Sequence, residues 1–361
     1  MELDMSFYRG KRVLVTGHSG FKGTWLCRML VLAGADVTGY ALDASTEPSM
    51  FGLVEAGTWM RSVTGDIRNL QRLSETFASI EPDIVFHLAA QPIVRDSYSD
   101  PVTTYQTNVI GTVNLLECCR QSKTVRSVVN VTTDKVYRNN EWCWAYREND
   151  ELDGYDPYSN SKSCSELISR CYRDCFFTRD EKSLISLSTV RAGNVIGGGD
   201  FAVDRLIPDC VRAARVNEQM IIRNPESTRP FQHVLDALYA YLMIAAAQYD
   251  ESCYAGCYNV GPADNGCCRV ADVVHKFAEY WKNSLTVVIK SDNGPHEASM
   301  LRLDCSRLSS VFRWNPCWDI DTSIRRTAEW YLAWNNGENI LAVTDHQIYN
   351  YLEERKNGRL E

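Results

Sequence analysis

Residues 11–30 read KRVLVTGHSGFKGTWLCRML, and they decide the fold that we expect for the chain. The β-branched run Lys11–Gly17 predicts a short buried strand, and the apolar residues after Gly23 predict a helix. Between them, Gly17 permits a tight turn, Gly20 lets the backbone approach a pyrophosphate, and Gly23 lets the helix pack closely on its strand. The helix N-terminus would face that negative charge. The stretch therefore predicts a dinucleotide-binding loop, and the alternative is a glycine turn without a ligand.

Strands and helices alternate along the first half of the chain. The apolar run Asp83–Ala90 has no polar face, as expected for a parallel strand that is buried on both sides. This alternation is typical of an α/β protein with a doubly wound parallel sheet, the Rossmann architecture. The remaining predicted elements are strands over Asp36–Leu42, Ser62–Ile67, Ser127–Val131 and Leu184–Val190, and helices over Pro101–Arg120 and Pro157–Cys175.

Acidic residues end the second and third predicted strands. Asp43 can accept hydrogen bonds from a ribose 2′-hydroxyl and would repel a 2′-phosphate, which favours NAD over NADP. Lys22 and Ser45 leave a phosphate contact open. Asp66 could meet the adenine amino group or cap the next helix. The other residues expected at the cofactor are Gly17, Gly20, Phe21, Gly23, Ile67, Leu88, Ala89, Ala90, Asn108, Val131, Thr132, Tyr158 and Lys162.

Tyr158 and Lys162 lie four residues apart on a predicted helix, so they share one face of it. A tyrosine has a pKa of about 10 in water, and a nearby cation stabilises the phenolate and lowers that value. Reaching neutral pH requires about 4 kcal/mol, of which Lys162 and a cationic nicotinamide ring would each supply part. The pair predicts a general base, and an ordinary surface helix is the alternative.

The sequence changes in texture after Asn194. We predict that residues 1–194 form the cofactor-binding domain and that the chain returns to it over about 228–262. Residues 195–227 and 263–361 are predicted to form a smaller, mixed α/β substrate domain. Arginine forks suit a diphosphate, so Arg223, Arg229, Arg302 and His296 are candidates for holding one, with surface ion pairs as the alternative. The other predictions here are a flexible loop over Gly197–Asp200 and helices over Arg205–Arg215 and within Trp314–Trp334. The tail from Asn335 is polar and does not indicate a particular element.

The composition excludes several classes of protein. The chain has 361 residues and a net charge of −8, and it lacks the run of ~18 apolar residues that crosses a membrane. Neither nucleic acid nor a membrane is therefore an expected partner. The first residues lack an apolar signal core, which predicts a cytoplasmic protein with reduced, mostly buried cysteines. Metal is not expected, because zinc-site spacing is missing from Cys253, Cys257, Cys267 and Cys268.

Four motifs together resemble the extended short-chain dehydrogenase/reductase family. They are the glycine loop, His87-Leu88-Ala89-Ala90, Asn108-Val109-Ile110-Gly111-Thr112 and Tyr158-x-x-x-Lys162. Within that family, Thr133-Asp134 followed by Val136-Tyr137 resembles the sugar-nucleotide 4,6-dehydratases. Most of those have glutamate after the aspartate, whereas this chain has Lys135. Together with Arg191–Asp200 and Arg229–Val234, the Thr-Asp-Lys triplet is similar to the members that act on CDP-glucose.

This resemblance implies an NAD-dependent dehydration of CDP-glucose, in which hydride moves from C4 to C6 of the hexose and water is lost. Tyr158 would take the proton of the 4-hydroxyl, and Thr133 would hydrogen-bond the 4-oxygen. Asp134 would protonate the departing 6-hydroxyl, which requires a raised pKa. Lys135 would either remove the C5 proton as a neutral amine, with a pKa far below about 10.4, or stabilise the enolate as a cation.

The resemblance also implies a homodimer or homotetramer that pairs through the helix of Tyr158, and a step towards CDP-linked deoxysugars of bacterial surface polysaccharide such as lipopolysaccharide O-antigen. A 4-epimerase, or a dehydratase for another nucleotide sugar, is the nearest alternative, although an epimerase needs no acid and base at C5 and C6. A non-catalytic redox sensor would need neither Tyr158 nor Asp134. The residues expected at the substrate are Gln91, Asn194, Arg205, Leu206, Arg229, His233, Asn259, His296 and Arg302.

Overall fold

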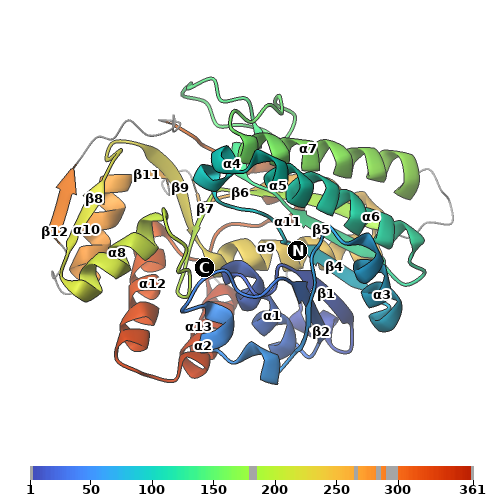
Figure 1. Cartoon of the computed structure of the whole chain (residues 1–361), viewed down its shortest axis with the longest axis horizontal. Coiled ribbons are helices and arrows are strands. Elements are labelled where there is room, and N and C mark those ends of the chain that lie inside the picture. Colours follow the sequence, from blue (N-terminus) through green and yellow to red (C-terminus); the bar gives the residue numbers. More distant parts are fainter. Residues whose placement is uncertain (1–2, 179–184, 264–266, 282–285, 290–299, 359–361) are drawn as a thin grey trace.

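The computed structural model describes residues 3–178, 185–263, 267–281, 286–289 and 300–358. Its largest feature is a parallel seven-stranded sheet in the order β10-β6-β5-β4-β1-β2-β3 (Figure 1). The order reverses between β1 and β4, where an open sheet of this kind binds its ligand. The strands are β1 Arg12–Thr16, β2 Asp36–Ala41, β3 Arg61–Thr64, β4 Ile84–His87, β5 Ser127–Val131, β6 Ser186–Ala192 and β10 Cys257–Val260.

Alternate residues of the central strands face two separate cores. In β1, Val13 and Val15 belong to one buried cluster, whereas Leu14 belongs to the other. Because helices cover both faces, apolar residues are required at every position of such a strand. The predicted Rossmann fold is therefore confirmed. Helices α1 (Phe21–Leu32) and α9 (Val234–Asp250) cover the first face, and α3 (Leu70–Ile80), α6 (Gly111–Gln121) and α7 (Pro157–Tyr172) cover the second.

A smaller part of the chain lies to the left of the large sheet in Figure 1. It holds a mixed sheet in the order β11-β9-β7 and a parallel pair, β12 and β8, which confirms the predicted mixed architecture. The residue limits of the two domains stay a prediction. Its elements are β7 Asn194–Ile196, α8 Leu206–Val216, β8 Gln219–Ile222, β9 Thr228–His233, β11 Cys267–Arg269, α10 Val270–Tyr280, β12 Thr286–Ile289, α12 Ile320–Asn335 and α13 Ile340–Asn357. Helix α11 (Ser306–Phe312) contacts β10 of the large sheet.

Helix α9 is buried on all sides. Every residue from Val234 to Gln248 is buried, and the helix lies against β5 and β6. A helix without a polar face has no helical period in its sequence, so periodicity does not predict it. Near it, β10 brings residues 257–260 into the large sheet beside β6.

Residues Gly197–Asp200 form a turn as predicted, but the expected flexibility is wrong, because all four residues are buried. Trp25 Nε1 donates a hydrogen bond of 2.9 Å to the carbonyl oxygen of Gly198. A Cβ atom on Gly198 would lie 2.1 Å from the indole ring of Trp330. Glycine makes room for a tryptophan at this position and does not provide mobility.

The polar stretch after Asn335, for which the sequence indicated no particular element, contains the 18-residue helix α13. Asn339 caps the helix by accepting a hydrogen bond from the Ala342 nitrogen. Its buried face includes Ile340, Ile348 and Tyr351.

The predicted helices at the other face are present with one irregularity each. Helix α5 (Pro101–Tyr105) continues through a π-helical turn, Gln106–Ile110, into α6. A second π-helical turn, Arg173–Phe177, follows α7. π-helical turns are frequent at functional sites, and the first of these carries Asn108.

The cysteines are less buried than expected. Four of the 14 are buried, namely Cys27, Cys118, Cys119 and Cys210, so the prediction of mostly buried thiols is wrong. Among the described residues, His, Cys, Asp and Glu side chains form no cluster of three that could hold a metal ion. No helix in the described part of the chain is both long and apolar enough to span a membrane.

Candidate active site

The glycine loop between β1 and α1 is too tightly packed for side chains at two of its three glycines. Gly17 has a φ of +74°, which favours glycine, and a Cβ there would lie 2.7 Å from the Ala89 nitrogen. A Cβ on Gly23 would lie 2.2 Å from the Gly17 oxygen. At Gly20 a Cβ would meet only that same oxygen, at 3.5 Å. Close packing therefore explains glycine at 17 and 23, whereas the approach of a pyrophosphate to Gly20 stays a prediction.

Asp43 lies just beyond β2, where its side chain is exposed and accepts a hydrogen bond from Thr64 Oγ1 at 3.4 Å. Lys22 lies elsewhere, since its charge interacts with Arg205, Asp134 and Asp200. The charges around Lys22 place it towards the catalytic candidates. They do not support the alternative that Lys22 holds a 2′-phosphate near Asp43.

Asp66 lies just beyond β3 and pairs with Arg68 at 2.6 Å, an ion pair that lowers the pKa of Asp66. The next helix, α3, is capped by Asn69, which accepts a hydrogen bond from the Arg72 nitrogen. The alternative that Asp66 caps this helix is therefore wrong. A contact with adenine stays a prediction.

The turn Asp134–Val136 follows β5 closely and holds a buried carboxyl group. Thr133 Oγ1 donates a 3.0 Å hydrogen bond to Asp134 Oδ1, and the buried Oδ2 atom has no hydrogen-bond partner among the described residues. Burial raises the pKa of Asp134, while the charges of Lys135, Arg229 and Lys22 oppose this effect. A buried carboxyl group with a raised pKa and a free oxygen can hold a proton and donate it.

Tyr158 and Lys162 lie in the first two turns of α7, as predicted. Lys162 Nζ donates a 3.1 Å hydrogen bond to the Val131 carbonyl, and burial lowers the pKa of Lys162 to about 8. Burial raises the pKa of Tyr158 to about 12, and a hydrogen bond with Thr133 opposes it. The expected lowering of the tyrosine pKa is thus absent in the protein alone, because the cost of burying the phenolate exceeds the effect of its neighbours.

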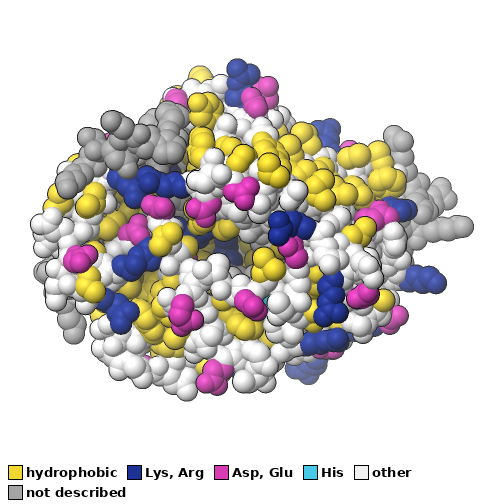
Figure 2. All heavy atoms as spheres, in the orientation of Figure 1, with side chains coloured by type: hydrophobic (Ala, Val, Ile, Leu, Met, Phe, Trp, Pro, Cys, Tyr) yellow, Lys and Arg dark blue, Asp and Glu magenta, His cyan; other side chains and the backbone are white. Residues whose placement is uncertain are grey.

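Positive charges from three distant segments converge on these residues. Arg205, at the start of α8, pairs with Asp200 at 3.0 Å and interacts with Tyr158. Arg229 in β9 is only 8% exposed and interacts with Asp134, as does Lys22 from α1. Figure 2 shows a hollow near the centre of this face with Lys or Arg side chains visible inside it.

A family model described as GDP-mannose 4,6 dehydratase matches residues 14–327 of this chain. The chain belongs to the GDP-mannose 4,6-dehydratase family. A curated relative, CDP-glucose 4,6-dehydratase from Salmonella typhimurium, is 47% identical over 353 residues, covering 97% of this chain and 98% of the relative. A probable dTDP-glucose 4,6-dehydratase from Sinorhizobium fredii is 28% identical, covering 89% of this chain and 93% of the relative. The resemblance inferred from the motifs is therefore confirmed.

Solved structures of similar fold include epimerases and dehydratases. UDP-glucose 4-epimerase from Thermotoga maritima aligns with a TM-score of 0.78 and 21% identity, covering 90% of this chain and 99% of the epimerase. dTDP-glucose 4,6-dehydratase from Bacillus anthracis, solved in complex with NAD, aligns with a TM-score of 0.74 and 21% identity, covering 91% and 99%. At this identity the likeness shows only that the dehydratase family and the epimerases share a fold.

Two residues expected at the substrate are completely buried in this 4,6-dehydratase fold. His233 caps α9 by accepting a hydrogen bond from the Leu235 nitrogen, and its ring lies 4.6 Å from that of Trp318. Asn259 accepts a 2.6 Å hydrogen bond from the Tyr137 hydroxyl and donates to two backbone carbonyls. Both side chains make structural contacts and have almost no exposed surface, and direct contacts with the substrate stay predictions.

Gln91 and Asn108 connect the loop after β4 to α7. The Gln91 nitrogen donates to Asn108 Oδ1 at 2.8 Å, and Asn108 Nδ2 donates to Ser161 Oγ at 2.8 Å. The Gln91 side chain donates a hydrogen bond to Thr104 Oγ1 and accepts one from the Ile93 nitrogen. Both residues therefore position the site, and direct contacts with cofactor or substrate stay predictions.

The remaining candidates have ordinary positions. Arg302 is exposed, Arg223 pairs with Asp204 at 2.9 Å, and His296 lies outside the described residues. Ile67 is buried next to Gly111, and the backbone N–H of Ala89 donates a hydrogen bond to Thr16 Oγ1. Partly exposed positions are occupied by Phe21, Leu88, Ala90, Asn194 and Leu206, and buried ones by Val131 and Thr132.

One buried charged group was not predicted. Glu166 lies one turn beyond Lys162 on α7, and its carboxylate pairs with Arg191 of β6 at 2.9 Å. The spacing Tyr158, Lys162, Glu166 places all three on one helical face, and that sequence signal was available.

Proposed function

We propose that this chain dehydrates CDP-glucose to CDP-4-dehydro-6-deoxyglucose with NAD as a resident cofactor. The observation that carries the reaction type is the buried Asp134 carboxyl group with its free Oδ2 atom, next to Thr133 and Tyr158. An acid at this position serves elimination at C6 and has no use in epimerisation at C4. The choice of CDP-glucose rests on the relative from Salmonella typhimurium.

The residues of the loop after β1 fit a dinucleotide. The Gly17 backbone lies too close to the Ala89 nitrogen for a Cβ atom to fit between them. Gly20, the N-cap residue of α1, has only the Gly17 oxygen near its Cβ position. The N-terminus of α1 favours a pyrophosphate there. The exposed carboxylate of Asp43 can accept a hydrogen bond from a ribose 2′-hydroxyl in addition to the one from Thr64. We therefore propose a preference for NAD over NADP, which binding titrations with both cofactors test.

The chain's own residues divide the reaction between oxidation and elimination. When bound, NAD accepts hydride in the oxidation at C4 and returns it in the reduction at C6. Tyr158 takes the proton of the 4-hydroxyl, while Thr133 holds the 4-oxygen. The resulting ketone acidifies the C5 proton. Asp134, kept protonated by burial, then donates its proton to the departing 6-hydroxyl.

Lys135 has two possible roles in that elimination. It can remove the C5 proton as a neutral amine, or it can stabilise the enolate as a cation while another group acts as the base. A Lys135→Met variant in deuterated solvent decides between these roles. Loss of exchange at C5 identifies the lysine as the base, and persistent exchange identifies it as the stabiliser.

The test of the proposed function compares CDP-glucose with TDP-, UDP- and GDP-hexoses as substrates. The 4-keto product absorbs in the near ultraviolet after alkaline treatment. Product from CDP-glucose far above the others supports the proposal. Product only from another nucleotide, or an epimer without a 4-keto product, contradicts it.

The same proposal includes a homo-oligomer and a role in supplying CDP-linked deoxysugars for surface polysaccharide. Figure 2 shows a band of hydrophobic side chains over the face of α4 (Val94–Ser99) to α7. The band includes Val102 at 64%, Leu167 at 52% and Ile110 at 50% exposed. An apolar surface of this kind supports pairing through the helix that carries Tyr158.

A further inference from the structure

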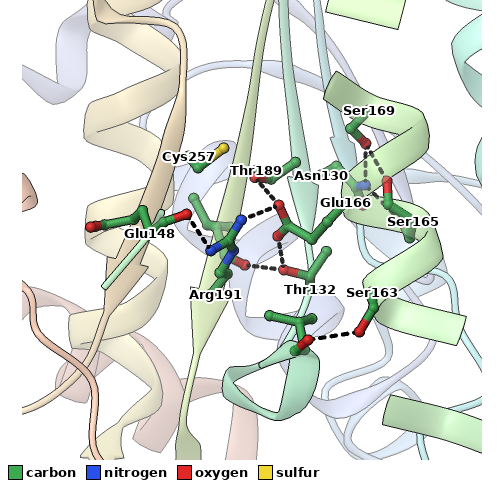
Figure 3. Close-up of polar contacts among 12 residues, drawn as sticks. Asn130, Thr132, Glu148, Ser163, Ser165, Glu166, Ser169, Thr189, Arg191 and Cys257 are labelled. Carbon is green, nitrogen blue, oxygen red and sulfur yellow. Dashed lines mark hydrogen bonds and ion pairs between the residues drawn. The ribbon is translucent and has the colours of Figure 1, made fainter. Parts of the chain in front are cut away.

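The short segment Thr133–Lys135 is held at both ends by the helix that carries Tyr158 (Figure 3). Before it, Thr132 Oγ1 donates a 2.5 Å hydrogen bond to Glu166 Oε1 on α7. After it, Ser163 Oγ, also on α7, donates a 2.7 Å hydrogen bond to the Val136 carbonyl. The three residues between these anchors therefore have a fixed position relative to α7.

The anchor at Glu166 is itself rigid. Its side chain is 1% exposed and accepts hydrogen bonds from Thr132, from Thr189 Oγ1 at 2.7 Å and from Arg191 Nη2 at 2.9 Å. Arg191 in turn donates to the Tyr137 hydroxyl and the Glu148 carbonyl, as Figure 3 shows in part. A carboxylate with three donors has one orientation, because any rotation would leave buried donors unpaired.

We propose that Glu166, acting through Thr132, is a positioning residue for the dehydration, an inference that rests on the proposed function. The 4-oxygen of the hexose must meet Thr133 and Tyr158 together, and the first lies on the segment after β5 while the second lies on α7. The hydrogen bond between Thr132 and Glu166 fixes the distance between these two elements next to Thr133, together with the bonds from Lys162 to the Val131 carbonyl and from Ser163 to the Val136 carbonyl. Displacing reacting groups by ~1 Å can cost about 10²-fold in rate.

The two threonines that donate to Glu166 provide a matched test. Thr132→Val and Thr189→Val make the same change in shape and each remove one hydrogen bond to the same carboxylate. Only Thr132 adjoins Thr133 and Asp134. Changing Glu166 itself is less informative, because the unpaired guanidinium of Arg191 would destabilise the fold.

For each variant and for the wild-type protein, the measurements are the kcat and KM for CDP-glucose, the Kd for NAD and the Tm. We expect Thr132→Val to lower kcat by about tenfold or more with KM within about threefold. Thr189→Val should match its fall in Tm but keep kcat within about threefold. Thr132→Ser, which restores the hydroxyl, should recover most of the lost kcat.

Equal kcat in the two valine variants overturns the inference, whether both remain high or both fall together with Tm. A lower affinity for NAD with an unchanged kcat at saturation also overturns it. An unchanged chain that fails to convert CDP-glucose refutes the proposed function instead, so the two failures are distinguishable.

Discussion

At Tyr158, burial and hydrogen bonding act in opposite directions on the phenol. Burial raises the pKa of the phenol to about 12, and the hydrogen bond with Thr133 lowers it. Lys162, whose pKa is about 8, is mostly charged at neutral pH. A phenolate base therefore depends on cationic groups close to it. The candidates are Arg205, whose charge lowers the pKa of Tyr158, Lys162 on α7, and the nicotinamide ring of bound NAD.

In the proposed reaction Tyr158 accepts the proton of the 4-hydroxyl, and phenylalanine lacks the oxygen atom that this role requires. Tyr158→Phe should lower turnover by at least about 10²-fold, the usual effect of losing a general base, with little change in substrate binding. Steady-state kinetics and calorimetric titration of CDP-glucose measure the two quantities. Turnover near that of the unchanged chain would exclude the assigned role.

Asp134 should affect elimination and not the first oxidation. Asp134→Asn keeps the shape of the side chain but lacks the acidic proton, so the near-ultraviolet absorbance of the reduced cofactor should build up in a single turnover. The acid works only when protonated, and burial raises its pKa, so elimination in the unchanged chain should slow as pH rises through that raised value. A variant that never reduces the cofactor would contradict this division of labour.

At the scale of elements, whether a helix or strand can be predicted from the sequence depends on which of its faces are exposed to solvent. Strands of the large sheet are apolar runs bounded by polar residues, and Ser127–Val131 was predicted to the residue. Helix α9 has no polar face, so no period marks it. Helix α13, in contrast, has a helical sequence pattern. Asn339 is a typical N-cap residue, and the buried residues at 340, 344, 348 and 351 recur at helical spacing.

The candidate site divides in the same way. Local motifs identified Tyr158, Asp134 and the glycine loop as parts of the site. Each of these motifs lies within a single helix or loop, so its residue spacing can be read from the sequence. The positions of Lys22, Arg205 and Arg229 depend on how three distant segments pack, which no local pattern specifies. The cap that His233 forms on α9 could not be predicted, because a helix cap and a ligand contact look the same in sequence.

Helix α13 should contribute strongly to stability through its buried face. Ile348 is fully buried, so Ile348→Ala should lower the free energy of unfolding by about 2–5 kcal/mol. Its neighbour Tyr349 is 53% exposed, and Tyr349→Ala should change the free energy of unfolding by less than about 0.5 kcal/mol. Denaturant unfolding measures both, and equal effects would mean that α13 is not docked as described.

At the scale of the whole molecule, three buried neutral histidines make stability depend on pH. Burial lowers the pKa of His18 to about 4 and those of His87 and His233 to about 3, from 6.5. A group with a lowered folded pKa stabilises fully above its unfolded pKa and loses that contribution as pH falls. Stability should therefore fall below about pH 6.5, and His87→Gln should reduce the slope by about 1.4 kcal/mol per pH unit. An unchanged slope in His87→Gln, measured by unfolding at several pH values, would contradict this.

The apolar band over α4 to α7 predicts the assembly. Leu167→Glu places a charge on an exposed apolar position of α7 and should convert the proposed oligomer to a monomer in sedimentation velocity. Val216→Glu, at a position that is 62% exposed at the end of α8, should leave the assembly unchanged. An oligomer that persists in Leu167→Glu would place the interface elsewhere.

The docking of α13 limits how this enzyme can be recombined with its relatives. One continuous buried cluster contains residues of β1, α1, α9, α12 and α13, and Arg28 of α1 pairs with Asp345 of α13 at 2.6 Å. A chimera joined near residue 263 would combine α1 and α9 from one parent with α12 and α13 from another, and their side chains would not interlock. Chimeras between relatives should therefore take α1, α9, α12 and α13 from the same parent.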